Sequence, residues 1–259
     1  MGTLFRGKRV LVTAGSDGIG KVIATSFWNE GASVHICGRR DDKLHECVSE
    51  LQEMTYTVAD VSKYDDVKRL FYDIETKIGG LDILVNNAGI SGPTGRVDEI
   101  NPEAWVQTMR TNIDSQFYCV KFAVPMMIKA GGGSIVNIGS TASLFAYPMR
   151  APYASSKWAV IGFTKTIAKE LGEFKIRANV ICPGCVNGPR IDGVIEREAA
   201  KLGIGQKAVR DGYLEQTAMH TFIDAEDIAD MCLYLCSPAG AKISGQVMVV
   251  DGFTENCHS

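Results

Sequence analysis

Short apolar runs alternate with amphipathic helical patterns along the chain, and this alternation constrains the fold more than any other feature. We expect strands at residues 9–15, 33–38, 56–61, 81–89, 133–140, 176–184 and 246–252. We expect helices between them at about 18–30, 65–79, 104–131, 153–172 and 225–237. Strands joined through helices pair in parallel, and right-handed crossovers place helices on both faces of the sheet. The pattern predicts an α/β fold, a doubly wound parallel sheet of about seven strands of the Rossmann type.

No linker, repeat or low-complexity tract divides the 259 residues, so we expect a single domain over 1–259. One insertion, at about 187–222, differs from the rest because it is polar, rich in charge and weakly periodic. Loops beyond the carboxyl ends of parallel strands commonly carry binding functions. We therefore expect this insertion to be a loop-rich lid over a substrate.

The charge balance argues against a polyanionic partner. The formal net charge is −3, and adjacent basic residues occur only as isolated pairs, Lys8–Arg9, Arg39–Arg40 and Lys68–Arg69. We expect no nucleic-acid partner. No apolar run approaches the roughly 20 residues that span a bilayer, and the first residues lack the apolar segment of a signal peptide. These observations predict a cytoplasmic protein without a membrane partner.

Cys182 and Cys185 have the C-x-x-C spacing of a redox or metal motif. A redox dithiol usually opens a helix, whereas here an apolar run leads into a segment rich in proline and glycine. None of the four histidines has metal-ligand spacing to these cysteines. We therefore expect reduced cysteines and no metal site.

The segment TAGSDGIG, residues 13–20, follows the first expected strand and opens the first expected helix. Glycines in this context allow a tight turn and let backbone N–H groups approach a pyrophosphate. A turn without any ligand is the alternative interpretation. The context favours a dinucleotide site.

A phenol and an ammonium, Tyr153 and Lys157, are four residues apart in an expected helix and therefore share one face. An ammonium about 4 Å from a phenol contributes up to roughly 4 kcal/mol at an effective dielectric near 20. This attraction lowers the pKa of the phenol from its usual value of about 10, while burial opposes the change. The spacing alone is also common in ordinary surface pairs.

The order of these motifs resembles the short-chain dehydrogenase/reductase family over nearly the whole chain. The family pattern T-G-x-x-x-G-x-G is matched by Thr13, Gly18 and Gly20, but Ala14 stands in place of the first glycine. The NNAG motif at 86–89 also matches. The resemblance implies a nicotinamide-dependent oxidoreductase that acts on CH–OH groups.

The resemblance implies a catalytic tetrad of Asn112, Ser140, Tyr153 and Lys157. In the family, the tyrosine exchanges a proton with the substrate oxygen and the serine hydrogen-bonds that oxygen. The lysine stabilises the phenolate and binds the nicotinamide ribose. The asparagine holds a water that relays protons to the lysine.

The resemblance also implies the cofactor contacts. They are Gly15, Ser16, Asp17, Gly18, Ile19, Gly20, Asp60, Val61, Asn87, Ala88, Gly89, Tyr153, Lys157, Pro183, Gly184 and Val186. A family threonine that binds the carboxamide is replaced by Gly188, so we expect backbone groups or Asn187 to take its place.

Two arginines at the end of the second expected strand bear on the choice of nicotinamide. A carboxylate at this position accepts the ribose 2′-hydroxyl of NAD, but here Gly38 is followed by Arg39 and Arg40. A 2′-phosphate favours a guanidinium. We therefore expect NADP in preference to NAD. The alternative is that both arginines are solvated loop charges.

The tetrad does not select a substrate, because family members act on polyols, sugars, steroids, acyl thioesters and small ketones. We expect a sugar, a polyol, a hydroxy acid or a 3-oxoacyl compound. We expect Arg150 and Arg190, together with Ser140, to contact the substrate, and an anion would explain the two arginines. The alternative is solvated lid cations balanced by Asp192, Glu196 and Glu198. Three alternative functions stay open: an epimerase, a dehydratase, or a non-catalytic nicotinamide sensor. The resemblance further implies a homotetramer.

Overall fold

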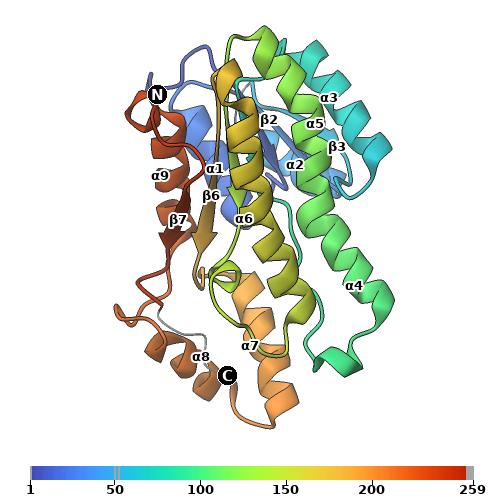
Figure 1. Ribbon diagram of the computed structural model, residues 1–259, viewed down its shortest axis with the longest axis vertical. Helices are drawn as coiled ribbons and strands as arrows, with labels where there is room; N and C mark the ends of the chain where they lie inside the picture. The colour runs from blue at the N-terminus through green and yellow to red at the C-terminus, as the bar shows by residue number, and fades with distance from the viewer. Residues whose placement is uncertain (1, 50, 52, 255–259) are drawn as a thin grey trace.

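Parallel strands form one sheet in the order β3-β2-β1-β4-β5-β6-β7. The computed structural model describes residues 2–49, 51 and 53–254 (Figure 1). The strands within this part are β1 (Arg9–Thr13), β2 (Ser33–Gly38), β3 (Thr55–Val58), β4 (Ile83–Asn86), β5 (Gly133–Ile138), β6 (Ile176–Pro183) and β7 (Val247–Val250). The strand order reverses between β1 and β4, which confirms the predicted doubly wound sheet.

Helices cover both faces of the sheet because successive strand residues point to opposite faces. Val10 and Val12 contact the core under α1 (Gly18–Asn29), α2 (Asp41–Ser49) and α9 (Ala225–Cys236). Leu11 contacts the opposite core, under α3 (Tyr64–Ile78), α5 (Ser115–Lys129) and α6 (Ala151–Leu171). Each central strand is apolar on both faces, as a buried parallel sheet requires.

The helix expected over 104–131 contains an irregular turn at the position of Asn112. Its parts are α4 (Pro102–Met109), the π turn η2 (Arg110–Asp114) and α5. A π turn inserts one extra residue and is common at functional sites. Short 3₁₀ turns complete the described helices: η1 (Val97–Glu99), η3 (Thr141–Ser143), η4 (Gly172–Phe174) and η5 (Pro238–Gly240).

The insertion at about 187–222 is helical, so the expectation of a loop-rich segment is wrong. It forms α7 (Pro189–Leu202) and α8 (Gln206–Glu215), which lie beyond the carboxyl ends of the strands (Figure 1). Ile195 and Ala199 of α7 pack against Val209 and Tyr213 of α8 in a small separate core. Each helix buries one apolar face, but the low overall apolar content of both segments hides that pattern in the sequence.

Every described strand except β2, whose range matches the expected 33–38, ends earlier than expected. The run expected over 81–89 ends at Asn86, and the run expected over 56–61 ends at Val58. Residues after these points form loops at the carboxyl edge of the sheet. No helix in the described residues combines the length and the apolar character needed to cross a membrane.

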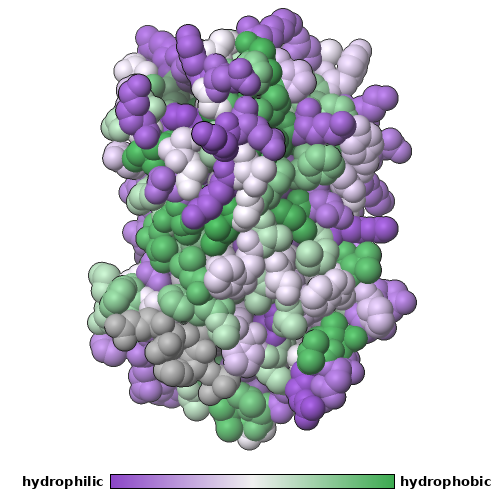
Figure 2. Space-filling view, viewed as in Figure 1, coloured by the Kyte–Doolittle hydropathy of each residue, from purple (hydrophilic) through white to green (hydrophobic). Residues whose placement is uncertain are grey.

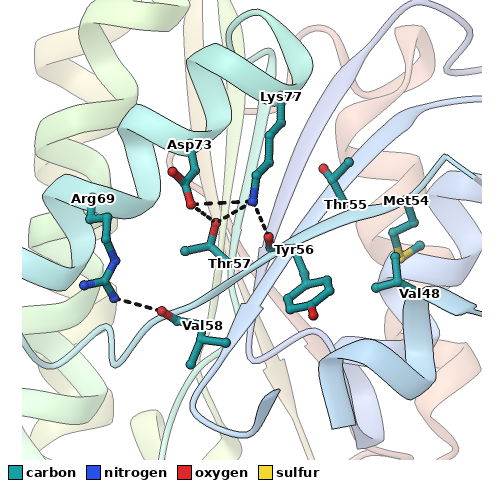
Figure 3. A pocket seen from close by; sticks show the side chains of 9 residues that line it. All are labelled: Val48, Met54, Thr55, Tyr56, Thr57, Val58, Arg69, Asp73 and Lys77. Carbon is teal, nitrogen blue, oxygen red and sulfur yellow. Dashed lines mark hydrogen bonds and ion pairs between the residues drawn. The ribbon is translucent and has the colours of Figure 1, made fainter. Parts of the chain in front are cut away.

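Strand β3 lies at one edge of the sheet, beside a shallow groove (Figure 3). Lys77 donates to the Tyr56 carbonyl oxygen at 2.6 Å, and Arg69 donates to the Val58 carbonyl oxygen at 2.8 Å (Figure 3). An edge strand with free backbone groups can pair with another chain, and lysine side chains at the edge oppose such pairing. The two cations of α3 therefore protect this edge.

Candidate active site

A cavity of about 430 Å³ lies at the carboxyl ends of the strands. The loops after β1, β4, β5 and β6 line it together with α7 and α8. The predicted site residues that line this cavity are Asp17, Gly18, Ile19, Gly20, Asn87, Gly89, Ser140, Arg150, Tyr153, Lys157, Pro183, Gly184, Val186 and Arg190. Ligands of open α/β sheets bind at this edge, where the strand order reverses.

The glycine turn leaves room for a ligand at the start of α1. Gly18 has φ +49°, and no atom would lie within 4 Å of a Cβ added there. A Cβ on Gly20 would lie 2.2 Å from the Ala14 carbonyl oxygen, so this residue must be glycine. The Asp17 side chain accepts a hydrogen bond from the Gly18 N–H at 2.8 Å and caps the helix. The open helix N-terminus fits the diphosphate of a dinucleotide.

Ala14, which stands where the family has a glycine, has a left-handed backbone conformation of the kind that glycine adopts most easily. Its φ is +51°, in the left-handed region that a β-carbon disfavours. Thr13 Oγ1 accepts hydrogen bonds from the N–H groups of Asn87 and Ala88, both at 3.0 Å. The Asn87 amide donates to the carbonyl oxygens of Thr13 and Ala14 at 3.0 and 3.3 Å. These contacts join the turn to the loop after β4.

Tyr153 and Lys157 lie one turn apart on α6 and both line the cavity. The Lys157 ammonium is buried, donates to the Ile138 carbonyl oxygen at 2.8 Å, and lies 5.8 Å from the centroid of the Tyr153 ring. Ser140 follows β5 and faces the same phenol. Its Oγ accepts from the Ala142 N–H at 3.2 Å, which leaves its proton free to donate.

The electrostatics of this group favour the phenolate. Burial raises the pKa of Tyr153, but the charges of Lys157 and Arg190, a hydrogen bond from Ser140 and the charge of Arg150 outweigh it, so the pKa is lowered. Burial also lowers the pKa of Lys157, and the neighbouring phenolate opposes this change. A phenol with a lowered pKa is a better base near neutral pH than free tyrosine.

Two tyrosines in the cavity wall were not predicted from the sequence. The Tyr147 and Tyr213 hydroxyls lie 3.0 Å apart, and Tyr213 donates to Glu198 Oε2 at 2.7 Å. Burial raises the pKa of Tyr147 to about 12. These two hydrogen bonds link the loop after β5 to α7 and α8. No local motif marks these residues, because only the tertiary fold brings them together.

Asn187 and Gly188, at the position of the family threonine, both line the cavity. The Asn187 amide donates to Asp224 Oδ1 at 2.7 Å, and its Oδ1 accepts from Arg210 at 3.4 Å. Gly188 has φ +134°, which a threonine would rarely adopt. Asn187 still lines the cavity, and its amide nitrogen has a second N–H, so both predicted substitutes for that contact stay open.

The comparisons with known proteins agree with this arrangement. The profile of the "short chain dehydrogenase" family matches residues 8–223. The chain belongs to the short-chain dehydrogenase family. It is 31% identical over 254 residues to a D-beta-hydroxybutyrate dehydrogenase of Cupriavidus necator, covering 96% of this chain and 98% of the relative.

Two solved structures of short-chain dehydrogenases have the same fold. NAD⁺-bound xylitol dehydrogenase superposes with a TM-score of 0.92 at 25% identity, covering 96% of this chain and 99% of that one. A variant of actinorhodin polyketide ketoreductase with NADPH gives 0.91 at 31% identity, covering 97% and 98%. This short-chain dehydrogenase is therefore an oxidoreductase of hydroxyl and keto groups in small molecules.

Not every predicted residue of this short-chain dehydrogenase lines the cavity. Asn112 is fully buried behind it. Its amide donates to the Ile90 carbonyl oxygen at 3.0 Å and to Ser156 Oγ at 2.9 Å, and its Oδ1 accepts from the Ile90 N–H at 2.8 Å. The other predicted residues outside the lining are Gly15, Ser16, Arg39, Arg40, Asp60, Val61 and Ala88.

Three of these residues form contacts around the glycine turn and after β3. Arg40 forms an exposed ion pair with Asp17 at 3.2 Å, across the glycine turn. Asp60 Oδ1 accepts from the N–H and the hydroxyl of Ser62 at 3.0 and 2.7 Å, which closes a turn after β3. A Cβ on Gly15 would lie 2.6 Å from Ile36, so Gly15 acts by close packing.

The C-x-x-C pair lies at the end of β6 and the loop that follows. Cys182 is buried, and burial raises the pKa of its thiol. Cys185 is half-buried at the cavity. Neither forms a disulfide, and the described residues contain no group of three His, Cys, Asp or Glu side chains placed to hold a metal ion.

Proposed function

We propose that this short-chain dehydrogenase interconverts a secondary alcohol and a ketone with NADP, using Tyr153 as the acid and base. One observation carries the proposal: Tyr153, beside the buried Lys157, lines the same cavity as the glycine turn. When bound there, the nicotinamide supplies the hydride acceptor or donor. The cavity residues Gly18, Asn87, Gly89 and Pro183 would hold it.

Each residue of the tetrad has a distinct part. Tyr153 takes the hydroxyl proton during oxidation and returns it during reduction. Ser140 donates to the substrate oxygen and fixes its position. Lys157 stabilises the phenolate and binds the nicotinamide ribose. Asn112 fixes the loop at Ile90, and the second lone pair of its Oδ1 can hold a water that leads to Lys157.

The preference for NADP rests on Arg39 and Arg40. Both are exposed at the end of β2, and Arg40 already pairs with the carboxylate of Asp17. A 2′-phosphate of nearly two negative charges would compete for this guanidinium. Asp60 and Val61 would border the adenine, while Gly15, Ser16 and Ala88 support the turn.

The substrate is a secondary alcohol or ketone of the sugar, polyol, hydroxy acid or 3-oxoacyl class. The names of the similar proteins include a hydroxy acid, a polyol and a polyketide, so they do not select one class. Ser140, Arg150 and Arg190 would contact it. The segment 187–222, with α7 and α8, would cover it as a lid.

We further propose a cytoplasmic homotetramer without membrane or nucleic-acid partners. Apolar side chains gather on the face that carries α6 and β7 (Figure 2). Trp158 of α6 is 51% exposed and Val249 of β7 is 44% exposed. Apolar patches of this kind commonly mark subunit contacts. The long helix α5 also exposes Phe117 and Ile128.

The test is a screen of alcohols and ketones with NADP and NAD, in wild type and in Tyr153→Phe. We expect net cofactor turnover, read as the absorbance of reduced nicotinamide, in wild type. Tyr153→Phe should lose it by roughly 100-fold or more and still bind NADP. Retention of most activity would refute the role of Tyr153. An epimerase would show product without net cofactor turnover.

A further inference from the structure

Three cations line the reactive end of the cavity: Lys157, Arg150 and Arg190. The only carboxylate among the described lining residues is Asp17. It belongs to the glycine turn, where it caps α1 and pairs with Arg40. Lys157 has the Tyr153 phenolate as its partner during the reaction. The charges of Arg150 and Arg190 therefore have no counter-ion from the described part of the chain.

Arg150 is the more unusual of the two because it is only 4% exposed. Its guanidinium carbon lies 5.3 Å from the centroid of the Tyr153 ring and 5.4 Å from that of Tyr147. One terminal nitrogen donates to the Ser91 carbonyl oxygen at 2.6 Å, while its buried Nε has no partner. A buried cation without a counter-ion is costly, and a bound anion would remove that cost.

Arg190 approaches the same site from the lid. It stands in the first turn of α7 and makes one long hydrogen bond, at 3.4 Å, to the Gly89 carbonyl oxygen. Its charge is close enough to act on both Tyr153 and Lys157. It is exposed and weakly held, so it can turn towards a ligand.

Three of the other lid cations differ from these two because they form ion pairs, while Arg197 donates to Ser91 Oγ at 3.3 Å. Lys201 pairs with Glu99 at 2.9 Å, Arg210 pairs with Asp192 at 3.0 Å, and Lys207 pairs with Asp211. None of them lines the cavity. Glu198, a candidate to balance the arginines, instead accepts from Tyr213. Balanced lid charges therefore account for these lysines and Arg210 but not for Arg150 or Arg190.

We propose that the substrate is a small hydroxy or oxo acid whose carboxylate is held between Arg150 and Arg190; this rests on the proposed oxidoreductase function. Guanidinium groups bind carboxylates through paired, charge-assisted hydrogen bonds. Because Arg150 lies against the Tyr153 ring, the carboxylate sits only a few bonds from the carbon that carries the hydroxyl. The carboxylate positions the substrate and takes no part in proton or hydride transfer.

The test measures binding to the NADP-saturated enzyme by calorimetry, using straight-chain carboxylates of three to six carbons and the amide of each. We expect at least one acid to bind about 10-fold or more tightly than its amide. Arg190→Gln and Arg150→Gln should each remove that difference, and Arg150→Lys should retain part of it. Arg210→Gln, an already paired arginine of the lid, is the control and should retain all of it. Since Arg190 is exposed, Arg190→Gln decides the question even where a change at buried Arg150 prevents folding.

Equal binding of acids and amides, or a difference that persists in Arg190→Gln, would overturn the proposal. The outcome is separate from that of the proposed function, because the hydroxy acids of the same lengths are also tested for net cofactor turnover. Arginine-dependent binding without any turnover supports the carboxylate site and contradicts the oxidoreductase assignment. Turnover of neutral alcohols, with no preference for acids in binding, supports the oxidoreductase assignment and contradicts the carboxylate site.

Discussion

The ammonium of Lys157 lies 5.8 Å from the centroid of the Tyr153 ring, and a 2.8 Å hydrogen bond to the Ile138 carbonyl oxygen holds it there. Because that carbonyl belongs to β5 and both side chains belong to α6, the sheet fixes the cation relative to the phenol. Thermal motion of a long lysine side chain is thus restricted at the point where the charge is needed.

Replacing Lys157 by methionine should raise the apparent pKa for alcohol oxidation. The phenolate is the base, so the rate of oxidation increases as the pH rises through the lowered pKa of Tyr153, and the rate of reduction decreases over the same range. Without the ammonium, burial raises that pKa, and kcat/KM for oxidation near pH 7 should fall by roughly 10-fold or more. Profiles of kcat/KM between about pH 6 and 10 measure the change.

Lys165→Met, at an exposed position of the same helix, is the control for this experiment. Its profile should match that of the wild type. An unchanged profile in Lys157→Met would contradict the electrostatic role of the ammonium.

Two glycines of the turn should respond differently to alanine. A methyl on Gly20 would overlap the Ala14 carbonyl oxygen, so Gly20→Ala should lower the melting temperature strongly. A methyl on Gly18 meets nothing within 4 Å, so Gly18→Ala should cost only about 1–2 kcal/mol for its positive φ, a shift of roughly 2–8 °C. It should nevertheless weaken NADP binding by about 10-fold or more, because the methyl enters the space of the diphosphate. Thermal unfolding measures the change in stability, and the fluorescence of reduced nicotinamide measures cofactor binding. Full cofactor affinity in Gly18→Ala would show that the diphosphate does not bind beside Gly18.

Removing Arg40 should change the choice of cofactor more than stability. Its ion pair with Asp17 is exposed, and such pairs contribute about 0–1 kcal/mol. We expect Arg40→Ala to raise the KM for NADP by roughly 10-fold and to leave the KM for NAD within about 3-fold, with a similar change in Arg39→Ala. Steady-state kinetics with both cofactors measure this. Equal changes in the KM values for NADP and NAD would contradict this prediction and would show that both arginines are solvated surface charges.

His35 should make the protein less stable in weak acid. Its ring is fully buried in β2, contacts Thr55 Oγ1 and Thr57 Oγ1 at 2.8 and 3.1 Å, and burial lowers its pKa to about 3. The unfolded chain binds this proton near pH 6.5, so its stabilising contribution is complete above that pH and is lost as the pH falls towards 3. Each pH unit in this window should cost about 1.4 kcal/mol.

Urea unfolding at several pH values between 7 and 4, in wild type and His35→Gln, isolates that contribution. The difference in the free energy of unfolding between the two proteins should change with pH by about 1.4 kcal/mol per unit below 6.5. Because every other titrating group is common to both proteins, its contribution cancels. A difference that does not vary with pH would show that His35 takes up its proton as readily in the folded chain as in the unfolded chain, which contradicts the prediction.

Parts of the structure that depend on short-range periodicity were predictable. The alternation of apolar runs and helical patterns predicted the parallel sheet, and the spacing of Tyr153 and Lys157 placed both on one face of α6. Strand ends were less accurate: Ala88 and Gly89 continue an apolar run but lie in the loop that lines the cavity wall. The helices α7 and α8 were missed because the segment is largely polar, although each helix buries one apolar face.

By itself, the sequence determined the fold class, the glycine turn and the phenol–ammonium pair, because helical pitch and strand pleat relate neighbouring residues at fixed intervals. Only the tertiary structure decided that Arg150 is buried without a counter-ion, that Tyr147 meets Tyr213, and that Asn112 is enclosed by Ile90 and Ser156. These contacts join segments far apart in the chain, and the crossovers of the sheet, rather than any local pattern, set which of them meet.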